Sequence, residues 1–225
     1  MAGRVSRRYE RMAWSRGFRF VAGTDEVGRG ALFGPVVAAA VILDPARRIP
    51  GLDDSKRISA ARRTELAQKI RERSLSYAVA YVNPERIDAW NIYQASAQAM
   101  LAALAQLHPA PDFVLSDAMP LKLGTVRPTR RQEPTPCLPL IGGDARSVSV
   151  AAASVLAKVE RDALMRELDQ LYPGYGLARH KGYATREHLE KLRRYGPTPL
   201  HRRSFAPVRA CLEWVYNAEQ EVFPF

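Results

Sequence analysis

The feature that most constrains the fold is the stretch from residue 24 to residue 43, which reads TDEVGRGALFGPVVAAAVIL. Two adjacent acids, Asp25 and Glu26, run into a glycine-rich turn, and ten residues without a charge (34–43) follow it. A run this apolar predicts a strand that is buried on both faces of a sheet. The turn is shorter than the roughly twelve residues that a helical crossover needs, so it favours an antiparallel return from a strand at 18–23.

The rest of the chain alternates between helical and extended patterns. This alternation predicts an α/β protein with a mixed sheet, followed by a basic C-terminal region. Cap residues and prolines give the expected boundaries. The expected elements are, in chain order, a helix at 58–73 capped by Ser59, a strand at 75–82, a helix at 84–108 behind Asn83, a strand at 112–118, a proline-rich loop at 127–139, a short strand or turn that leads into a long helix at 147–172, and loops with short helices from 173 onward.

The formal net charge of +11 indicates a polyanionic partner, because a strongly basic surface attracts nucleic acid. The excess is concentrated between Arg179 and Arg203, where eight basic residues stand against two acids. This concentration favours a duplex-binding surface, and a generally arginine-rich surface is the alternative. His180 and His201 lie in the same run, where we expect phosphate contact or local packing instead of proton transfer.

The apolar fraction of 47% and the charged fraction of 25% are typical of a globular protein. Cys137 and Cys211 match no metal-ligand spacing, which favours a reducing compartment and argues against zinc. No stretch reaches the roughly 18 apolar residues of a membrane span, and residues 1–14 lack the apolar segment of a secretory signal. We therefore expect a cytoplasmic protein without a membrane partner. The aromatic residues at 89–90 and 213–216 have helical spacing and are expected in the core.

The glycines of the turn invite comparison with a dinucleotide-binding fingerprint. Gly28, Gly30 and Gly34 give the spacing G-x-G-x-x-x-G, which is one residue longer than the fingerprint. They also lead into a strand, whereas the fingerprint opens a helix. The pattern therefore argues against a dinucleotide site.

Two further acids occupy places comparable to those of Asp25 and Glu26. Asp117 ends the strand expected at 112–118, and Asp144 follows a double glycine. Acids gathered from several strand ends repel one another unless a cation compensates them. Oxygen ligands without histidine or cysteine suit Mg²⁺ or Mn²⁺. The four acids are therefore candidate metal ligands, although a solvated strand end is the alternative for any pair taken alone.

Six segments of the chain, in the same order, resemble the motifs of the type 2 ribonucleases H, and the chain is most similar to the bacterial ribonuclease HII family. The resemblance extends over roughly residues 18 to 208, and six motifs in order are far more specific than any one of them. The segments are TDEVGRGALFGPVVAAAVIL (24–43), LDDSKRIS (52–59), LSDAMPL (115–121), GGDARSVSVAAASVLAKVERD (142–162), YPGYGLARHKGYAT (172–185) and GPTPLHRRSFAPV (196–208).

The resemblance implies a ribonuclease H-like mixed sheet flanked by helices, with a helical C-terminal extension. We accordingly divide the chain into an N-terminal basic segment (1–17), a catalytic domain (18–172) and a substrate-binding region (173–225). It also implies that Asp25, Glu26, Asp117 and Asp144 form the active site and hold two Mg²⁺ or Mn²⁺ ions when substrate is bound. The residues expected to bind substrate are Gly28, Arg29, Gly30 and Tyr175, which would recognise the RNA–DNA junction, and Lys56 and Lys181, which would contact phosphate.

The expected activity is hydrolysis of the RNA strand of RNA–DNA hybrids, including cleavage on the 5′ side of a single ribonucleotide embedded in duplex DNA. The products would carry 5′-phosphate and 3′-hydroxyl ends, and the enzyme is expected to act as a monomer. Two alternatives share some of these features. A junction resolvase or transposase core would share the acids but not a turn that senses a 2′-hydroxyl, and a non-catalytic hybrid-binding protein would not need all four acids.

Two segments depart from the common pattern of the family. Asp117 and Asp144 stand 27 positions apart, which is longer than usual, so residues 122–139 are interpreted as a surface-loop insertion. The final residues, AEQEVFPF (218–225), loosely resemble peptides that dock on a sliding clamp. The function of both segments stays open at this level.

Overall fold

The structure is a computed structural model that describes residues 5–123 and 134–213. The chain forms two compact units, which we describe separately. The first unit contains the sheet, and the second contains the turn after Glu26 and most of the C-terminal region. The first unit comprises Met1–Val27, Val37–Tyr81 and Ser96–Glu160, and the second comprises Gly28–Val36, Val82–Ala95 and Arg161–Phe225.

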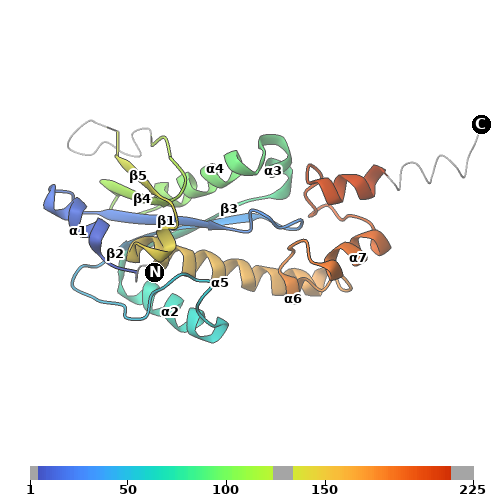
Figure 1. Cartoon of the computed structure of the whole chain (residues 1–225), viewed down its shortest axis with the longest axis horizontal. Helices are drawn as coiled ribbons and strands as arrows, with labels where there is room; N and C mark the ends of the chain where they lie inside the picture. Colours follow the sequence, from blue (N-terminus) through green and yellow to red (C-terminus); the bar gives the residue numbers. More distant parts are fainter. Residues whose placement is uncertain (1–4, 124–133, 214–225) are drawn as a thin grey trace, which may run out of the picture. The chain divides into compact units, whose positions relative to one another are not determined.

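A five-stranded mixed sheet forms the centre of the first unit, with the strand order β3-β2-β1-β4-β5 (Figure 1). β1 pairs with β2 in antiparallel orientation and with β4 in parallel orientation, which confirms the antiparallel return expected from the short turn. All eight residues of β2 are buried, as its apolar sequence predicts. The strands are β1 (Val21–Val27), β2 (Val36–Leu43), β3 (Ser74–Val82), β4 (Phe113–Asp117) and β5 (Cys137–Leu140).

The strand β5 replaces the last part of the loop expected at 127–139, so that prediction is wrong for residues 137–139. β5 lies at the edge of the sheet and pairs in parallel only with β4, where Ser116 is opposite Pro139. An edge strand tolerates proline because one side of its backbone needs no partner. The proline content therefore indicated an edge strand as much as a loop. Residues 124–133 of the insertion lie outside the described residues.

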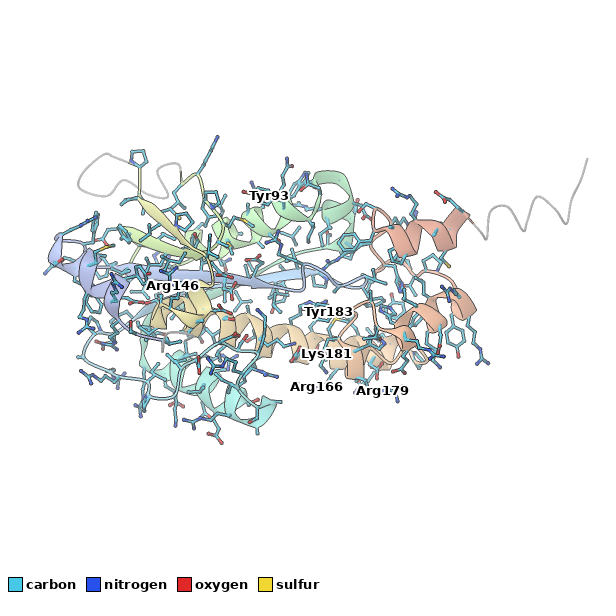
Figure 2. The ribbon with its side chains drawn as sticks, viewed as in Figure 1. Tyr93, Arg146, Arg166, Arg179, Lys181 and Tyr183 are labelled. Atoms are coloured by element: carbon cyan, nitrogen blue, oxygen red, sulfur yellow. The ribbon has the colours of Figure 1, made fainter. Side chains whose placement is uncertain are left out.

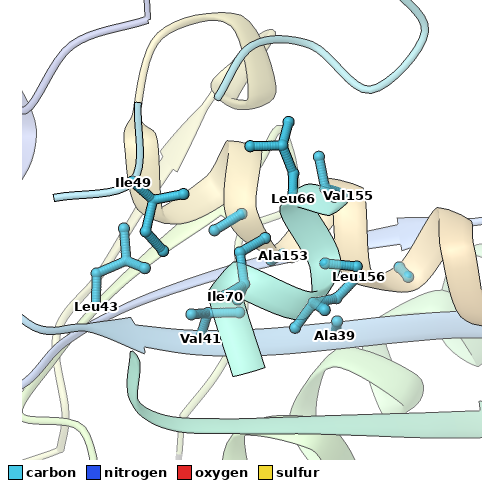
Figure 3. Close-up of a cluster of buried hydrophobic side chains, with 12 residues drawn as sticks. Ala39, Val41, Leu43, Ile49, Leu66, Ile70, Ala153, Val155 and Leu156 are labelled. Atoms are coloured by element: carbon cyan, nitrogen blue, oxygen red, sulfur yellow. The ribbon is translucent and has the colours of Figure 1, made fainter. Parts of the chain in front are cut away.

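Helices cover both faces of the sheet. α2 (Ala60–Arg73) and α5 (Val148–Leu171) lie on one side and α4 (Ile92–Ala105) on the other (Figure 1). Apolar side chains of β2, α2 and α5 form a continuous buried cluster that includes Val41, Ile70 and Leu156 (Figure 3). Burial of this kind contributes about 25 cal/mol per Å² of apolar surface, so the cluster fixes α5 against the sheet.

The helix expected at 84–108 is two helices, α3 (Pro84–Trp90) and α4, so the single helix is a wrong prediction. The break is at Asn91, whose φ of 72° is left-handed. Asn91 ends α3 by donating its N–H to the carbonyl of Ile87 and begins α4 by accepting from the N–H of Gln94. A positive φ is uncommon outside glycine, and the continuous helical periodicity gives no sign of it. The cap predictions are confirmed, because Ser59 and Asn83 both accept a backbone hydrogen bond.

Trp90 was expected in the core, but it is only half-buried, and the guanidinium carbon of Arg86 lies 5.3 Å from the centre of its ring. Residues 214–216 of the second aromatic group lie outside the described residues.

The N-terminal segment contains a helix that its basic composition did not indicate. α1 (Arg8–Ser15) packs Met12 and Ala13 against Phe113 of β4 and Leu140 of β5. The short strand or turn expected at the start of 147–172 is an isolated bridge between Ser147 and Ser6, and α5 begins at Val148. A 3₁₀ turn, Gly143–Ala145, precedes it. Gly23 allows α5 to approach β1 closely, since a Cβ there would lie 2.1 Å from the carbonyl carbon of Ser149.

The second unit consists of loops and short helices, as expected from residue 173 onward. Besides α3 and the end of α5, it contains α6 (Leu177–His180), α7 (Arg186–Tyr195) and a helical segment at 206–213. Two apolar clusters hold it together, one around Phe33 and Tyr175 and the other around Leu32 and Leu192. Among the described residues, no helix is both long and apolar enough to span a bilayer.

Candidate active site

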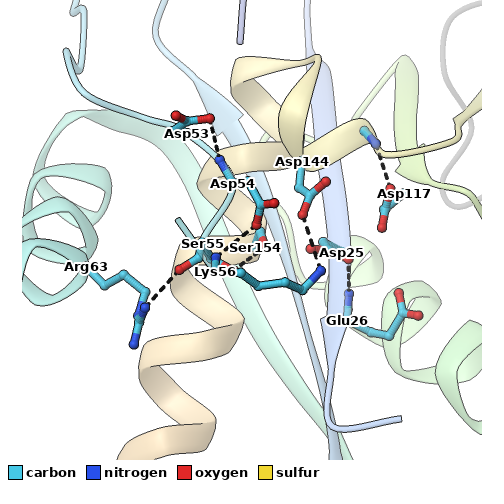
Figure 4. Close-up of polar contacts among 11 residues, drawn as sticks. Asp25, Glu26, Asp53, Asp54, Ser55, Lys56, Arg63, Asp117, Asp144 and Ser154 are labelled. Carbon is cyan, nitrogen blue, oxygen red and sulfur yellow. Dashed lines mark hydrogen bonds and ion pairs between the residues drawn. The ribbon is translucent and has the colours of Figure 1, made fainter. Parts of the chain in front are cut away.

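The four predicted acids all lie in the first unit, near the carboxyl ends of strands β1, β4 and β5 (Figure 4). Asp25 and Glu26 are inside β1, which extends three residues beyond Thr24 and not only to residue 23 as predicted. Asp117 is the last residue of β4, the parallel neighbour of β1. Because parallel strands end at the same edge, this pairing brings Asp117 to the carboxyl end of β1.

Asp144 reaches the same edge from the 3₁₀ turn that follows β5. Asp117 fixes this turn, because its Oδ1 accepts a 2.7 Å hydrogen bond from the N–H of Gly143. Glycine is suited to this position, since a Cβ on Gly143 would lie only 3.2 Å from side-chain carbons of Leu140 and Val150. The third and fourth acids are thus linked directly, and the long interval between them in the sequence does not separate them in space.

The site carries more negative charge than its surroundings compensate. Burial raises the pKa of Asp25 well above its usual value, and the charges of Glu26 and Asp117 raise it further, while a hydrogen bond from Ser154 lowers it. The pKa of Asp144 is also raised, first by burial and then by Asp117. Only 6% of Asp25 and 5% of Asp144 are exposed, so water can screen this repulsion little.

Lys56 is the cation that compensates the acids in this structure. Its Nζ lies 3.8 Å from Oδ2 of Asp144, and its side chain is 80% exposed (Figure 4). Burial lowers the pKa of Lys56, but the carboxylates of Asp144, Asp54 and Asp25 outweigh that effect and raise it. The structure therefore brings Lys56 to the acids, and its predicted contact with phosphate stays a prediction.

The chemistry of the site fits a divalent cation. All four side chains offer carboxylate oxygens, the hard ligands that Mg²⁺ and Mn²⁺ prefer, and the raised pKa values of Asp25 and Asp144 reflect burial first and then repulsion from neighbouring acids, which a cation would offset. Within residues 5–123 and 134–213, no three histidine, cysteine, aspartate or glutamate side chains are already gathered at metal-binding distance.

The predicted substrate-binding turn, Gly28–Gly30, belongs to the second unit. Gly28 has a φ of 92°, and a Cβ on it would lie 2.2 Å from Nε of Arg161. The fold therefore requires glycine at position 28. Gly30 is different, because it does not have a positive φ and a Cβ on it would meet nothing within 4 Å.

Tyr175 is a core residue of the second unit and is only 6% exposed. Its hydroxyl donates a 2.5 Å hydrogen bond to the carbonyl of Gly196. Its ring packs against His201 and Tyr195, with centroid distances of 5.2 and 5.7 Å. This environment accounts for a tyrosine here by packing alone, and the predicted contact with substrate stays a prediction.

Only some of the side chains in the basic run 179–203 are exposed. Arg179, Arg186, Arg193, Arg194 and Arg203 are exposed. Arg202 is fully buried and donates to the carbonyls of Gly34 and Arg29, so counting it as a surface charge is wrong. His201 is also buried, where it packs on Phe33, which confirms local packing as its role. Lys181 is half-buried, and its ammonium donates to the carbonyl of Ala178.

The sequence reading missed Arg161, which is fully buried in the second unit. It donates to the carbonyls of Phe33, Pro35 and Lys181, and its guanidinium lies over the ring of Tyr183; Lys181 and Tyr183 are labelled in Figure 2. Ser154, which hydrogen-bonds Asp25, was also missed. Both belong to the helical segment 147–172, where one charged or polar residue among many gives no signal of its own.

Comparison with known proteins agrees with this arrangement. A family model described as ribonuclease HII matches residues 22–208. A ribonuclease HII of Solibacter usitatus is 54% identical over 201 residues, which cover 89% of this chain and 84% of the relative.

Two solved structures share the fold. The ribonuclease H2 of Pyrococcus horikoshii is 26% identical with a TM-score of 0.72, over 88% of this chain and 99% of that one. The structure of a PCNA:RNase HII complex from Archaeoglobus fulgidus matches at 28% identity with a TM-score of 0.64, over 81% and 92% of the two chains. The ribonuclease H-like fold is thereby confirmed, and the chain belongs to the ribonuclease HII family of endoribonucleases.

Proposed function

We propose that this protein hydrolyses the RNA strand of RNA–DNA hybrids at Asp25, Glu26, Asp117 and Asp144. The observation that supports this most strongly is the gathering of four carboxylates, two of them with raised pKa values, at one edge of the sheet. A solvated strand end would not bury Asp25 or leave its charge opposed by three other acids. Buried carboxylates with raised pKa values and mutual repulsion are typical of a site that binds a ligand.

The four carboxylates would hold two Mg²⁺ or Mn²⁺ ions together with a phosphate oxygen of the substrate. When bound, such ions supply activation of water and stabilisation of the leaving 3′-oxygen, giving 5′-phosphate and 3′-hydroxyl ends. The protein's part is to hold the ligands in place, and the Asp117–Gly143 hydrogen bond does this for the turn of Asp144. Lys56, whose side chain is 80% exposed, would transfer from Asp144 to a phosphate of the substrate.

Selectivity for RNA would come from the turn at 28–30. Neither packing nor backbone conformation requires glycine at Gly30, so a need for close approach by a ligand accounts for it best. A ribose 2′-hydroxyl, which both donates and accepts hydrogen bonds, suits the backbone groups of Gly28, Arg29 and Gly30. Tyr175 would then recognise the sugar beside the cut, and Lys181 a neighbouring phosphate. With these contacts the enzyme would cut on the 5′ side of a single embedded ribonucleotide.

The exposed arginines of the second unit would bind the duplex backbone, since each neutralised phosphate releases a counterion. The relative from Archaeoglobus fulgidus was solved in a complex with PCNA. We propose a sliding-clamp interaction for this chain too, through the tail at 218–225, which lies outside the described residues. Hybrids and embedded ribonucleotides arise in the bacterial cytoplasm, where we expect the enzyme to act as a monomer.

The test is a cleavage assay on labelled duplexes that contain zero, one or four ribonucleotides, with Mg²⁺ or Mn²⁺ added. We expect no cleavage of the all-DNA duplex and a single cut on the 5′ side of the lone ribonucleotide. Asp117→Asn, which keeps the shape of the side chain, is the matched control and should be inactive. Cleavage of the all-DNA duplex would contradict the proposed substrate, and an active Asp117→Asn variant would contradict the proposed site.

A further inference from the structure

Glu10 is a buried carboxylate in the first unit that the proposed chemistry does not use. It lies in α1 and is 1% exposed. Its Oε1 accepts a 2.5 Å hydrogen bond from the hydroxyl of Ser147 and a 3.0 Å hydrogen bond from the N–H of Ser149. Its Oε2 has no hydrogen-bond partner among the described residues. Burial of a carboxylate costs free energy of folding, so we ask which contacts offset this cost.

Glu10 completes the cap of a helix to which it does not belong. Ser147 precedes α5, and its Oγ accepts a 3.2 Å hydrogen bond from the N–H of Val150. A capping box would normally add a Glu at the position of Val150, three residues after the cap. Here the carboxylate comes from α1, and the positive end of the helix dipole of α5 favours its charge.

The same contacts hold the turn that carries Asp144. The N–H of Ser147 donates a 2.8 Å hydrogen bond to the carbonyl of Gly143, the residue before Asp144. On the other side, the N–H of Gly143 donates to Asp117. The turn is therefore held by an acid of the site in front and, through Ser147, by Glu10 behind.

The N-terminal segment has a second hold on this region. The N–H of Ser6 donates to the carbonyl of Arg146, and the guanidinium of Arg146 lies 5.3 Å from the ring centre of Tyr9 and donates to its hydroxyl. The residues that the family model matches begin at position 22, so α1 lies outside them.

We propose that Glu10 of α1 is a positioning residue for the active site, which fixes the turn of Asp144 through Ser147. The inference rests on the proposed function, in which Asp144 binds a divalent cation. Residues that orient metal ligands typically change metal affinity or activity by about 10–100-fold when they are removed. A cap that only stabilised α5 would change stability without changing metal binding.

The experiment measures Mn²⁺ binding to the full chain by calorimetry and hydrogen exchange of the amides at 143–150. Glu10→Ala should raise the Kd for Mn²⁺ by about tenfold and speed exchange at 143–150. Glu10→Gln, whose amide oxygen can accept both hydrogen bonds, should restore most of the affinity. Met12→Ala is the matched control, because it weakens the packing of α1 and leaves the hydrogen bonds of Glu10 in place. It should lower Tm without changing the Kd for Mn²⁺.

Equal Kd values for Glu10→Ala and Met12→Ala would overturn the proposal and leave Glu10 as a structural cap. If Glu10→Ala does not fold, Ser147→Ala breaks the same link, and an unchanged Kd for that variant would overturn the proposal too. Asp144→Asn separates this failure from that of the proposed function. If Asp144→Asn binds Mn²⁺ normally, the assignment of Asp144 as a ligand is wrong, whatever Glu10 does.

Discussion

Asp25 in the first unit and two arginines in the second unit are buried charges with opposite surroundings. In the first unit, Asp25 is 6% exposed and is surrounded by other acids that raise its pKa. In the second unit, Arg161 and Arg202 are fully buried, and five backbone carbonyls accept their hydrogen bonds. Burial lowers the pKa of Arg202 to about 9, with a further contribution from Arg161, so Arg202 is still charged at pH 7.

Under the proposed function, this difference separates charges that bind a ligand from charges that hold the fold. A buried cation with carbonyl partners has most of its hydrogen-bonding needs met by the chain, although Nη2 of Arg202 has no partner among the described residues. The buried acids have their negative charge opposed by like charges, and Lys56 is the cation that the structure places beside Asp144. We therefore expect loss of an acid to remove activity but not stability, and loss of a buried arginine to do the reverse.

The largest effect is expected for Asp25→Asn. Cleavage should fall by at least about a thousandfold, equivalent to about 4 kcal/mol of transition-state stabilisation, because a metal ligand is removed. Stability should not fall. A carboxyl group with a raised folded pKa contributes stability that is full below the unfolded pKa and is lost as pH rises through the folded pKa, so ionisation of Asp25 destabilises the fold. A lower Tm for Asp25→Asn, measured without metal, would contradict the comparison.

The second prediction tests the other half of the comparison. Arg202→Met should lower the free energy of unfolding by about 3 kcal/mol, because it leaves the buried carbonyls of Gly34 and Arg29 without partners. The matched control is Arg203→Met, which changes the neighbouring, exposed arginine and should cost less than about 0.5 kcal/mol. Denaturant unfolding of both variants gives the measurement. Similar losses would show that burial of Arg202 is not what makes it important.

Tyr175 is the residue for which both halves of the comparison apply, since it is buried in the fold and predicted to touch substrate. Tyr175→Ala should reduce kcat/KM on a single embedded ribonucleotide by about 30-fold more than on a continuous hybrid, because a misplacement of about 1 Å can cost about a hundredfold in rate. On a continuous hybrid, many alternative phosphates can occupy the active site. Tyr175→Phe removes only the hydrogen bond to Gly196 and serves as the control. Equal losses of Tyr175→Ala on the two substrates would assign Tyr175 to the fold alone.

The exposed arginines should affect binding and nothing else. Neutral replacements of Arg193, Arg194 and Arg203 are expected to weaken duplex binding by about tenfold at moderate salt. They should also reduce the log–log salt slope by about 0.9 for each phosphate that the protein no longer neutralises. Arg202 is left out of this set because it is buried. A salt slope equal to that of the wild type would show that these arginines are solvated and do not bind phosphate.

Much of the fold could be predicted from local patterns. The apolar run of β2, the caps Ser59 and Asn83 and the short turn before β2 each depend on neighbouring residues, and each was confirmed. The break at Asn91 and the strand β5 were not predicted, because the first depends on the backbone conformation of one residue and the second on pairing with β4. Periodicity continues through Asn91, and the prolines before β5 conceal its pairing.

The candidate site divides in the same way. The four acids could be predicted because they lie at the ends of expected strands and inside motifs that resemble those of a known family. The buried arginines and Glu10 could not, since a charged residue is usually exposed and nothing in the sequence says otherwise. Arg202 was misassigned for this reason, as its place in a basic run suggested a surface. Burial of a charge is decided by partners distant in the chain, such as Gly34 for Arg202.

The smallest predicted effect is a response to acid that has opposite signs in the two units. Burial lowers the pKa of His201 to about 3, and the charge of His188, whose Nε2 lies 3.3 Å from Nε2 of His201, adds to the effect. A histidine with a lowered folded pKa contributes stability above its unfolded pKa of about 6.5 and loses it as pH falls toward 3. Asp25 and Asp144 have raised pKa values, so acid relieves their repulsion instead.

Between pH 6.5 and pH 5, the second unit should therefore lose on the order of 1 kcal/mol of stability per pH unit, while the first unit loses none. Hydrogen exchange, corrected for the intrinsic effect of pH, measures each unit separately within one molecule. His201→Gln should flatten the response of the second unit, and His108→Gln, which alters a histidine of the first unit, should not. The amides of both units could instead lose protection from hydrogen exchange equally as the pH is lowered. In that case acid would not destabilise the buried histidines and stabilise the buried acids, and the comparison would be wrong.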